Sequence, residues 1–423
     1  MMRSMFAGVS GLRNHQTRMD VIGNNIANVN TAGFKKSRVT FQDMLNQTVQ
    51  GASSPQGSRG GTNPQQVGLG MTIASIDTIQ TQGNLQSTGK MTDLAVQGDG
   101  FFMLGIGSDI IYTRAGNFDV DTNGNLVNPA GLKVQGWKPN SSGVIDTNSA
   151  LTGLTIVKGD TMAPTATANV AFANNLDVNT VIDATVPPAG PTVYHPLAVT
   201  VYDSLGVAKE LNIRIAKTAA NTWNAYIDTS DSAWATMGAT TITFNADGSF
   251  NGAAGGVITL THTNGATSPQ TVNANFARLT QYASESTARS VEPIVPATAE
   301  PGNAPGVLST YTIDKSGVIT GVYSNGLNKV LGQVALANFD NPAGLIKEGE
   351  NLYRKSNNSG EPDVGAAGKG GRGGISPGSL EMSNVDLSQE FTDMIITQRG
   401  FQANSRIITT SDEMLQELVN LKR

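Results

Sequence analysis

The chain has 423 residues, of which 39% are hydrophobic, 14% are charged and 6% are aromatic, with a formal net charge of −5. This length corresponds to about two to four domains. The negative net charge excludes a chain-wide basic field that would attract nucleic acid or anionic lipid. The sequence contains no cysteine, which excludes disulfides, cysteine-ligated metals and a thiol nucleophile.

Apolar residues recur at steps of three and four along the N-terminal segment, which predicts an amphipathic helix. We expect them to pack against another helix, and they are Met5, Val9, Leu12, Met19, Ile22 and Ile26. The same segment has no continuous apolar run after its basic start, so it is not a secretory signal peptide. No window approaches the roughly 20 apolar residues of a membrane span, and we expect no direct membrane insertion.

The C-terminal segment carries a longer pattern, with apolar residues seven apart. The repeat consists of Leu387, Met394, Phe401, Ile408 and Leu415, and Phe391 widens the apolar stripe. A sustained seven-residue repeat is typical of a helix packed on another helix in coiled-coil style. Ser383 or Asn384 is the expected N-cap.

Two interpretations of these helices stay open. Each could be an ordinary amphipathic helix docked on its own domain. However, glycine-rich, linker-like segments at 51–64 and 365–374 adjoin the helices, and a helix on a slack tether buries little against its own domain. The tethers favour pairing of the helices with each other or with other copies. The opposite net charges of the two ends fit pairing, and fit two solvated faces equally well.

The middle of the chain is predicted to be β-rich. Short runs of Val, Ile, Thr and Tyr alternate with polar residues at 197–203, 211–215 and 257–263, as in half-buried strands. Hairpin turns are predicted at Asn123-Gly124, Asp247-Gly248, Ser316-Gly317 and Asn325-Gly326. We expect two β domains of sandwich or barrel type.

The composition predicts that one β domain is nested in the other. Segments 86–149 and 284–364 are alike and are expected to form one discontinuous domain. Segment 150–283, which is richer in Ala, Thr and Asn, would be an outer domain inserted at a surface turn.

The remaining segments are assigned to the ends. Segments 1–30 and 384–423 would form a helical coiled-coil domain, and segments 31–85 and 365–383 would connect it to the body. The expected fold is therefore mainly β, multi-domain and nested, with a terminal α-helical coiled coil.

Motifs at both ends resemble the flagellar rod and hook axial protein family. The N-terminal motif spans 24–35, the C-terminal motifs span 383–391 and 394–405, and the body adds 97–102 and 332–339. The segment 332–339 is similar to hook proteins in particular. The N-terminal motif residues are Asn24, Asn25, Ala27, Asn28, Asn30, Thr31, Gly33 and Phe34.

The resemblance implies a non-enzymatic subunit of the bacterial flagellar hook. Such a subunit self-assembles into a flexible tube that transmits torque from the basal-body rod to the filament, with its paired terminal helices lining a channel. The implied partners are other copies of the chain, the distal rod protein, the hook cap, the hook–filament junction protein and the flagellar type III export apparatus. The implied location is extracellular, after export without a cleaved signal peptide. The large middle segment fits the hook protein better than the shorter distal rod protein.

The motif turn can be interpreted in two ways from its own residues. Gly33 can adopt positive φ, and Asn side chains bond to nearby backbone. Phe34 could then anchor the turn in a neighbour's apolar surface. A simple helix C-cap followed by a turn would use the same residues, and the family resemblance favours the assembly role.

No constellation in the sequence predicts catalysis, a metal or a cofactor. His15, His195 and His262 lack metal-ligand spacing. Residues 119–125 resemble part of a calcium loop, but Ala130 stands where a bidentate Glu is needed, so a hairpin is the better interpretation. The rival functions are an exported adhesin and a secreted polysaccharide hydrolase. A hydrolase would need paired carboxylates in an aromatic-lined cleft.

Overall fold

The computed structural model describes residues 2–55, 57, 59–107, 109–183, 185, 192–238, 240–254, 256–291 and 302–420. The chain forms two compact units. Unit 1 comprises Met1–Val157, Tyr311–Gly321 and Lys329–Arg423. Unit 2 comprises Lys158–Thr310 and Val322–Asn328.

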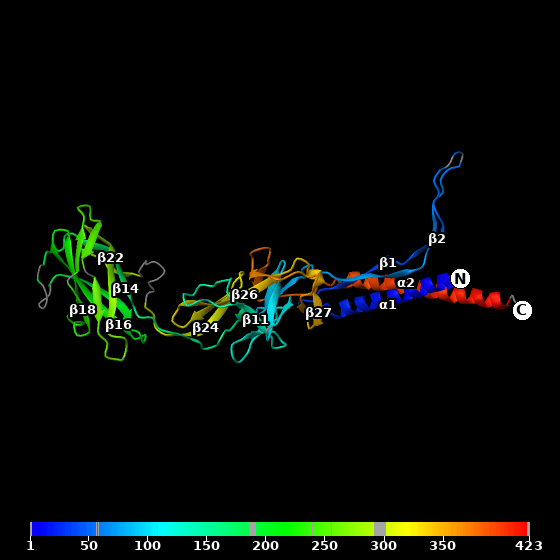
Figure 1. Ribbon diagram of the computed structural model, residues 1–423. Coiled ribbons are helices and arrows are strands. Elements are labelled where there is room, and N and C mark those ends of the chain that lie inside the picture. Colours follow the sequence, from blue (N-terminus) through cyan, green and yellow to red (C-terminus); the bar gives the residue numbers. More distant parts are fainter. Residues whose placement is uncertain are drawn as a thin grey trace. The chain divides into compact units, whose positions relative to one another are not determined.

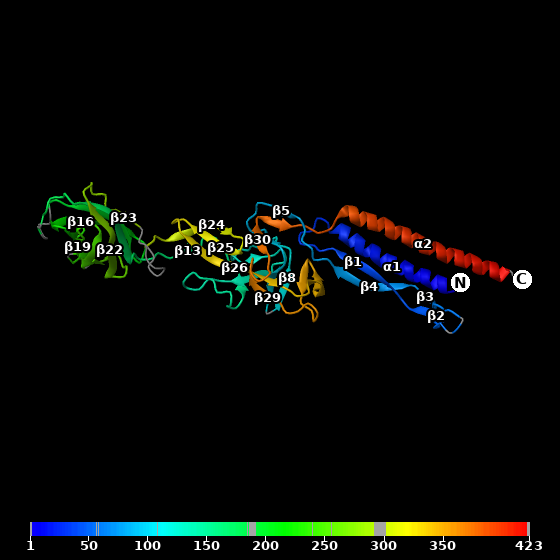
Figure 2. The same cartoon turned by 90° about the horizontal axis from the view of Figure 1, so that it is seen from above.

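Unit 1 contains both terminal helices, α1 (Met2–Ala27) and α2 (Leu387–Asn420). They lie side by side in both views (Figures 1 and 2), so the predicted terminal helical pair is confirmed. Neither is long and apolar enough, over the part that the structure describes, to cross a membrane.

The predicted N-cap of α2 is wrong. The Asp386 Oδ1 atom accepts hydrogen bonds from the backbone N–H groups of Ser388 at 2.8 Å and Gln389 at 3.2 Å, which is the geometry of an N-cap. Asn384 cannot serve because its Oδ1 atom accepts a hydrogen bond from the Lys36 N–H at 2.8 Å.

A two-stranded antiparallel ribbon packs along α1. It consists of β1 (Ser37–Asp43) and β4 (Met71–Thr78), and it continues into a hairpin of β2 (Asn46–Gln50) and β3 (Gln65–Gly68). The described residues of segment 51–64 therefore belong to the end of a hairpin rather than to a linear tether, and Ser53 and Thr62 form a further bridge there.

The expected slack tether at 365–374 is also wrong. Its ends belong to strands β29 (Asp363–Ala366) and β30 (Gly374–Pro377), which pair with β26 (Asn328–Asn338) and β6 (Leu94–Gln97). The glycines between these strands form a turn. Arg372 Nη1, within that turn, donates a hydrogen bond to Asp363 Oδ2 of β29 at 2.6 Å.

The remainder of unit 1 is a β body built around one sheet. Within it, strands follow the order β26-β11-β7-β8-β28-β27. The strands not yet given and a short 3₁₀ helix are β5 (Leu85–Ser87), β7 (Phe101–Ile106), β8 (Asp109–Thr113), β9 (Asp119–Val120), β10 (Leu126–Val127), β11 (Lys133–Trp137), β12 (Thr152–Gly153), η1 (Pro342–Gly344), β27 (Ile346–Gly349), β28 (Leu352–Arg354) and β31 (Ser379–Glu381). β24 (Gly306–Ile313) and β25 (Val318–Tyr323) have residues in both units.

Burial of aromatic side chains holds this body together. Phe101 and Tyr112 each contact Phe339 edge to face, with ring centroids 5.9 and 4.8 Å apart. Strand β26 pairs with β7 through Leu336 and Phe102. Segments from the two flanks of the middle therefore share one sheet. The four-part domain division predicted from composition stays a prediction.

Unit 2 is a β sandwich. Two five-stranded sheets have the orders β18-β21-β22-β14-β23 and β15-β16-β17-β19-β20, and buried side chains from both form one core. Its strands are β13 (Thr161–Met162), β14 (Asn169–Asp177), β15 (His195–Tyr202), β16 (Ala208–Ala219), β17 (Thr222–Ile227), β18 (Ala235–Met237), β19 (Thr240–Phe244), β20 (Phe250–Ala254), β21 (Val257–Leu260), β22 (Gln270–Tyr282) and β23 (Arg289–Val291). The prediction of a mainly β fold with terminal helices is confirmed.

The predicted hairpin turns are found at all four positions. Their glycines Gly124, Gly248, Gly317 and Gly326 have φ values of 78° to 82°, a region that glycine occupies without strain. The first turn joins the paired strands β9 and β10, so the hairpin interpretation of 119–125 is confirmed.

The core of unit 2 supplies a matched test of packing. Ile258 is fully buried, and its neighbour Val257 on β21 is 49% exposed. We expect Ile258→Ala to lower the free energy of unfolding of unit 2 by about 2–5 kcal/mol, because it leaves a cavity. Val257→Ala should change it by no more than about 0.5 kcal/mol. Urea unfolding followed by the fluorescence of Trp223 measures both, and equal effects would contradict the assigned core.

Candidate assembly surface and helix junction

The buried side chains of α2 are polar over the residues that the structure describes. They are Glu390, Thr397 and Ser411, and the partly buried Asn404 continues the same seven-residue spacing. We call these four residues the polar seam. Apolar periodicity alone does not indicate these polar residues, although their spacing of seven is visible in the sequence.

Glycines allow the two helices to approach closely at this seam. A Cβ atom on Gly11 would lie 2.5 Å from the Asn404 Nδ2 atom, and one on Gly8 would lie 3.4 Å from the Asn404 backbone oxygen. On α2, a Cβ atom on Gly400 would lie 2.9 Å from the ring of His15. A side chain on Gly11 would displace the Asn404 amide, and one on Gly400 would displace the His15 ring.

Most of the residues predicted to pack between helices are buried or partly buried. On α1, Ile22 is buried, and the others are partly buried: Met5, Val9, Leu12, Met19 and Ile26. On α2, Met394, Ile408 and Leu415 are partly buried, whereas Leu387, Phe391 and Phe401 are 38% to 49% exposed. Their role in packing stays a prediction.

Large apolar side chains remain exposed on both helices. We call them the apolar flank, and they are Met2, Phe6, Leu387, Phe391, Ile395, Ile396, Phe401, Ile407, Met414 and Val419. Phe401 lies three residues before Asn404 and Ile407 lies three after it, so the flank runs along both sides of the polar seam. Many large apolar side chains exposed on one pair of helices mark an interaction site.

Charged groups also cross between the helices. Arg18 Nη2 lies 3.1 Å from Asp393 Oδ1, and Glu390 accepts a hydrogen bond from Asn25 Nδ2 at 3.1 Å and lies 3.5 Å from Lys36 Nζ. The opposite charges of the two ends are thus partly paired. Because Arg18 and Asp393 are each 28% exposed, their pair contributes little stability.

The motif turn begins where α1 ends at Ala27. The Asn24 backbone oxygen accepts hydrogen bonds from both the N–H and the Nδ2 of Asn28, at 3.2 and 3.0 Å. Asn28 Oδ1 in turn accepts a hydrogen bond from the Thr31 hydroxyl at 3.1 Å. Asn30 is exposed. These contacts show how short polar side chains cap α1 and fix the turn.

Asn25 joins α1 to the ribbon. Its Nδ2 donates to the Ser37 oxygen at 2.8 Å, and its Oδ1 accepts from the Ser37 N–H at 3.0 Å. This buried side chain therefore imitates a strand partner at the start of β1, which explains why an amide is needed there.

Gly33 and Phe34 seat the turn on the β body. Gly33 has φ of 71°, and a Cβ atom there would lie 2.5 Å from the Ala115 backbone nitrogen. Phe34 is 9% exposed, and Lys347 Nζ lies 5.3 Å from the centre of its ring. The expectation that Phe34 inserts into a neighbouring molecule is wrong, because its own chain already covers it.

A buried cluster of charges lies beside this turn. Lys35 Nζ is 2.6 Å from Glu381 Oε1, with both side chains fully buried, and Arg114 Nε is 3.4 Å from Glu381 Oε2. Burial lowers the pKa of Lys35 and of Arg114, and in each the Glu381 carboxylate opposes that shift. Burial also raises the pKa of the nearby Tyr353 to about 12. We call Lys35, Arg114 and Glu381 the junction cluster.

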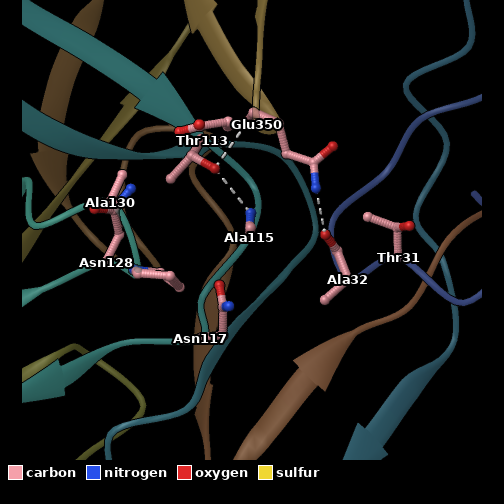
Figure 3. A pocket seen from close by; sticks show the side chains of 10 residues that line it. Thr31, Ala32, Thr113, Ala115, Asn117, Asn128, Ala130 and Glu350 are labelled. Atoms are coloured by element: carbon pink, nitrogen blue, oxygen red, sulfur yellow. Dashed lines mark hydrogen bonds between the residues drawn. The ribbon is translucent and has the colours of Figure 1, made fainter.

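A shallow hollow lies between the motif turn and the β body (Figure 3). Asn351 bridges the hollow. Its Nδ2 donates a hydrogen bond to the Ala32 backbone oxygen at 2.9 Å, and its backbone oxygen accepts one from the Thr113 hydroxyl at 2.9 Å. Glu350 is the only titratable residue lining the hollow, so it offers no acid–base pair. Within the described ranges, no group of three or more His, Asp or Glu residues could hold a metal ion.

Four family models match the chain. The model described as "Flagella basal body rod protein" matches residues 5–35, and "Flagellar basal body rod FlgEFG protein C-terminal" matches 376–421. Between them, "Flagellar hook protein FlgE/F/G D1 domain" matches 95–175 and "Flagellar basal body protein FlaE D2 domain" matches 175–293.

Relatives match over the whole length. The chain is 47% identical to the flagellar hook protein FlgE of Borreliella burgdorferi and 42% identical to that of Treponema pallidum, each covering all of both chains. The solved structure of the Helicobacter pylori flagellar hook protein FlgE2 is similar with a TM-score of 0.51 at 16% identity, covering 70% of this chain and 100% of that chain. This likeness concerns the fold alone.

Two glycines of α1 test the close approach of the helices. Replacing an interior helical Gly by Ala usually stabilises a helix by about 0.5–1 kcal/mol. Gly23 faces open space, so Gly23→Ala should raise the unfolding temperature of the helices. Gly11→Ala should not, because its methyl group displaces the Asn404 amide. Thermal unfolding followed by far-ultraviolet circular dichroism measures both unfolding temperatures. Equal increases in the two variants would contradict the close contact between Gly11 and Asn404.

Proposed function

The chain belongs to the flagellar hook protein family and is a structural subunit of the hook, and from this premise we propose that it self-assembles through α1 and α2 into a flexible tube. The tube would transmit torque from the basal-body rod to the filament. One observation carries the proposal: the helices of a single chain meet through a polar seam and leave their apolar flank exposed.

The physical drive for assembly is burial of the apolar flank. Phe6, Phe391, Ile395 and Ile396 are 49% to 62% exposed in the single chain. Burying a large apolar side chain completely contributes about 1.5–3 kcal/mol. Copies placed side by side would remove these side chains from water while each chain keeps its own polar seam.

Assembly would also complete the folding of the helices. Isolated helices are marginal in water, and most of their stability in proteins comes from packing an apolar face. In the single chain that face is mostly unpaired. Helices that are only weakly stabilised in the single chain could unfold to pass through a narrow export channel, which supports export to the extracellular flagellum without a cleaved signal peptide.

The same premise supports a role without catalysis. The partners would be other copies of the chain, with the distal rod protein below, the hook cap during growth and the hook–filament junction protein above. The flagellar type III export apparatus would deliver the subunits. A hook role is favoured over a rod role because the two hook proteins named above are 47% and 42% identical to the whole chain.

Negative-stain electron microscopy of the purified chain under polymerising conditions tests the proposal. Curved tubes are the expected result. Straight, short tubes would favour a rod subunit, and an absence of polymer under conditions that polymerise a known hook protein would contradict assembly through this chain alone.

The apolar flank can be tested at one position. Phe401→Asp should abolish polymerisation, because a tube that packs this position would have to bury an unpaired charge, at a cost of several kcal/mol. Thr392 provides the matched control, because it is exposed on the same helix and its seven-residue row (399, 406 and 413) contains no member of the apolar flank, and Thr392→Asp should still polymerise. Urea unfolding should show an unchanged β body in both variants. Normal tubes from Phe401→Asp would refute packing through the apolar flank.

A further inference from the structure

The two passages of the chain between the helices and the β body meet at one buried carboxylate. The chain enters the body after β4, through residues 79–93, and leaves it before α2, through residues 378–386. Both passages meet at Glu381, which belongs to β31. Strand β31 pairs with β5 of the other passage, with Glu381 opposite Leu85.

Glu381 binds each of the segments that converge there. Its Oε1 atom accepts hydrogen bonds from Lys35 Nζ at 2.6 Å and from the Gly83 N–H at 2.9 Å. Its backbone oxygen accepts from the Gly33 N–H at 2.7 Å. Residues of the motif turn and of the entering passage are thus held by one side chain and its backbone.

The other two members of the junction cluster, Lys35 and Arg114, bind backbone oxygens of different segments. Lys35 Nζ also donates to the Thr81 oxygen at 2.8 Å. Arg114, which follows β8 of the body, donates to the oxygens of Gly100 at 2.6 Å and Gly98 at 2.7 Å. Lys35 therefore ties the cluster to the helix side, and Arg114 ties it to the sheet.

The charges make this connection specific. The side chains of Lys35 and Glu381 are fully buried and that of Arg114 is 3% exposed. A buried ion cluster of this kind adds little net stability, but removing one member leaves an uncompensated charge and is strongly destabilising. Such clusters suit a role in fixing one arrangement of packed elements.

We propose that Lys35, Arg114 and Glu381 are positioning residues that lock the terminal helices to the β body, so that both move as one lever when the hook turns. This inference deepens the proposed function and rests on it. Helix packing between copies holds the tube together, whereas the junction cluster carries force from the helices of each subunit to its own body. Loss of the cluster should loosen the lever without abolishing assembly.

Hydrogen exchange of the soluble chain tests the lock without polymerisation. In Glu381→Gln, we expect amide exchange at 83–88 and 379–382 to accelerate roughly tenfold or more, while β7 and β26 keep their protection. Glu361, an exposed carboxylate paired with Lys355, gives the control Glu361→Gln, which should change neither region. Unchanged exchange at the junction would overturn the proposal. Lys35→Met serves as a second variant, and loss of protection throughout the body in both variants would also overturn it.

Spin labels test the lever in assembled tubes. The chain has no cysteine, so cysteines replacing Gly23 on α1, which faces open space, and the exposed Asp109 on β8 give one clean pair. In tubes diluted with unlabelled chain, Glu381→Gln should broaden the distance distribution between the labels, and Glu361→Gln should not. Equal widths would refute the lock. If the parent chain forms no tubes, the proposed function fails, and hydrogen exchange still decides the role of the cluster.

Discussion

The close contact between α1 and α2 at the polar seam determines how the rest of unit 1 can work. Because Gly8 and Gly11 present no side chain to α2, Asn404 approaches the α1 backbone closely, with Ile408 beside Gly8. Most of the large apolar side chains of α2 stay exposed. A chain that buried those residues in its own helix pair would be more stable alone and would have less surface with which to join other copies.

A polar seam also selects one register of the helix pair. Apolar contacts tolerate sliding, whereas hydrogen bonds such as that of Asn25 with Glu390 are satisfied in a single alignment. The motif turn and the junction cluster then relate this alignment to the β body. The specific contacts thus lie within a subunit, and the less directional apolar contacts are left for packing between copies.

Local patterns determined what the sequence could predict. The two terminal helices, the strands and the hairpin at Asn123-Gly124 follow from periodicity and turn chemistry, which act over a few residues. The junction cluster could not be predicted, because Lys35 and Glu381 are 346 residues apart and meet only after the chain has traversed both units. The N-cap failed for a related reason, since Asn384 is used by the distant Lys36 and leaves the cap to Asp386. The polar seam could have been predicted from the sequence, because its four residues are spaced by seven, but polar repeats must be considered together with apolar ones.

The position of Phe34 shows how a motif can serve assembly indirectly. The side chain is covered within its own chain and so adds nothing to a contact between copies. It instead fixes the turn that leads from α1 into β1, beside the place where Gly33 touches Ala115. The direction in which α1 leaves the body depends on that turn, and a small change in direction becomes a large displacement at the far end of a helix of 26 residues. Residues that never meet a neighbouring copy can therefore determine whether the apolar flanks of neighbouring copies coincide.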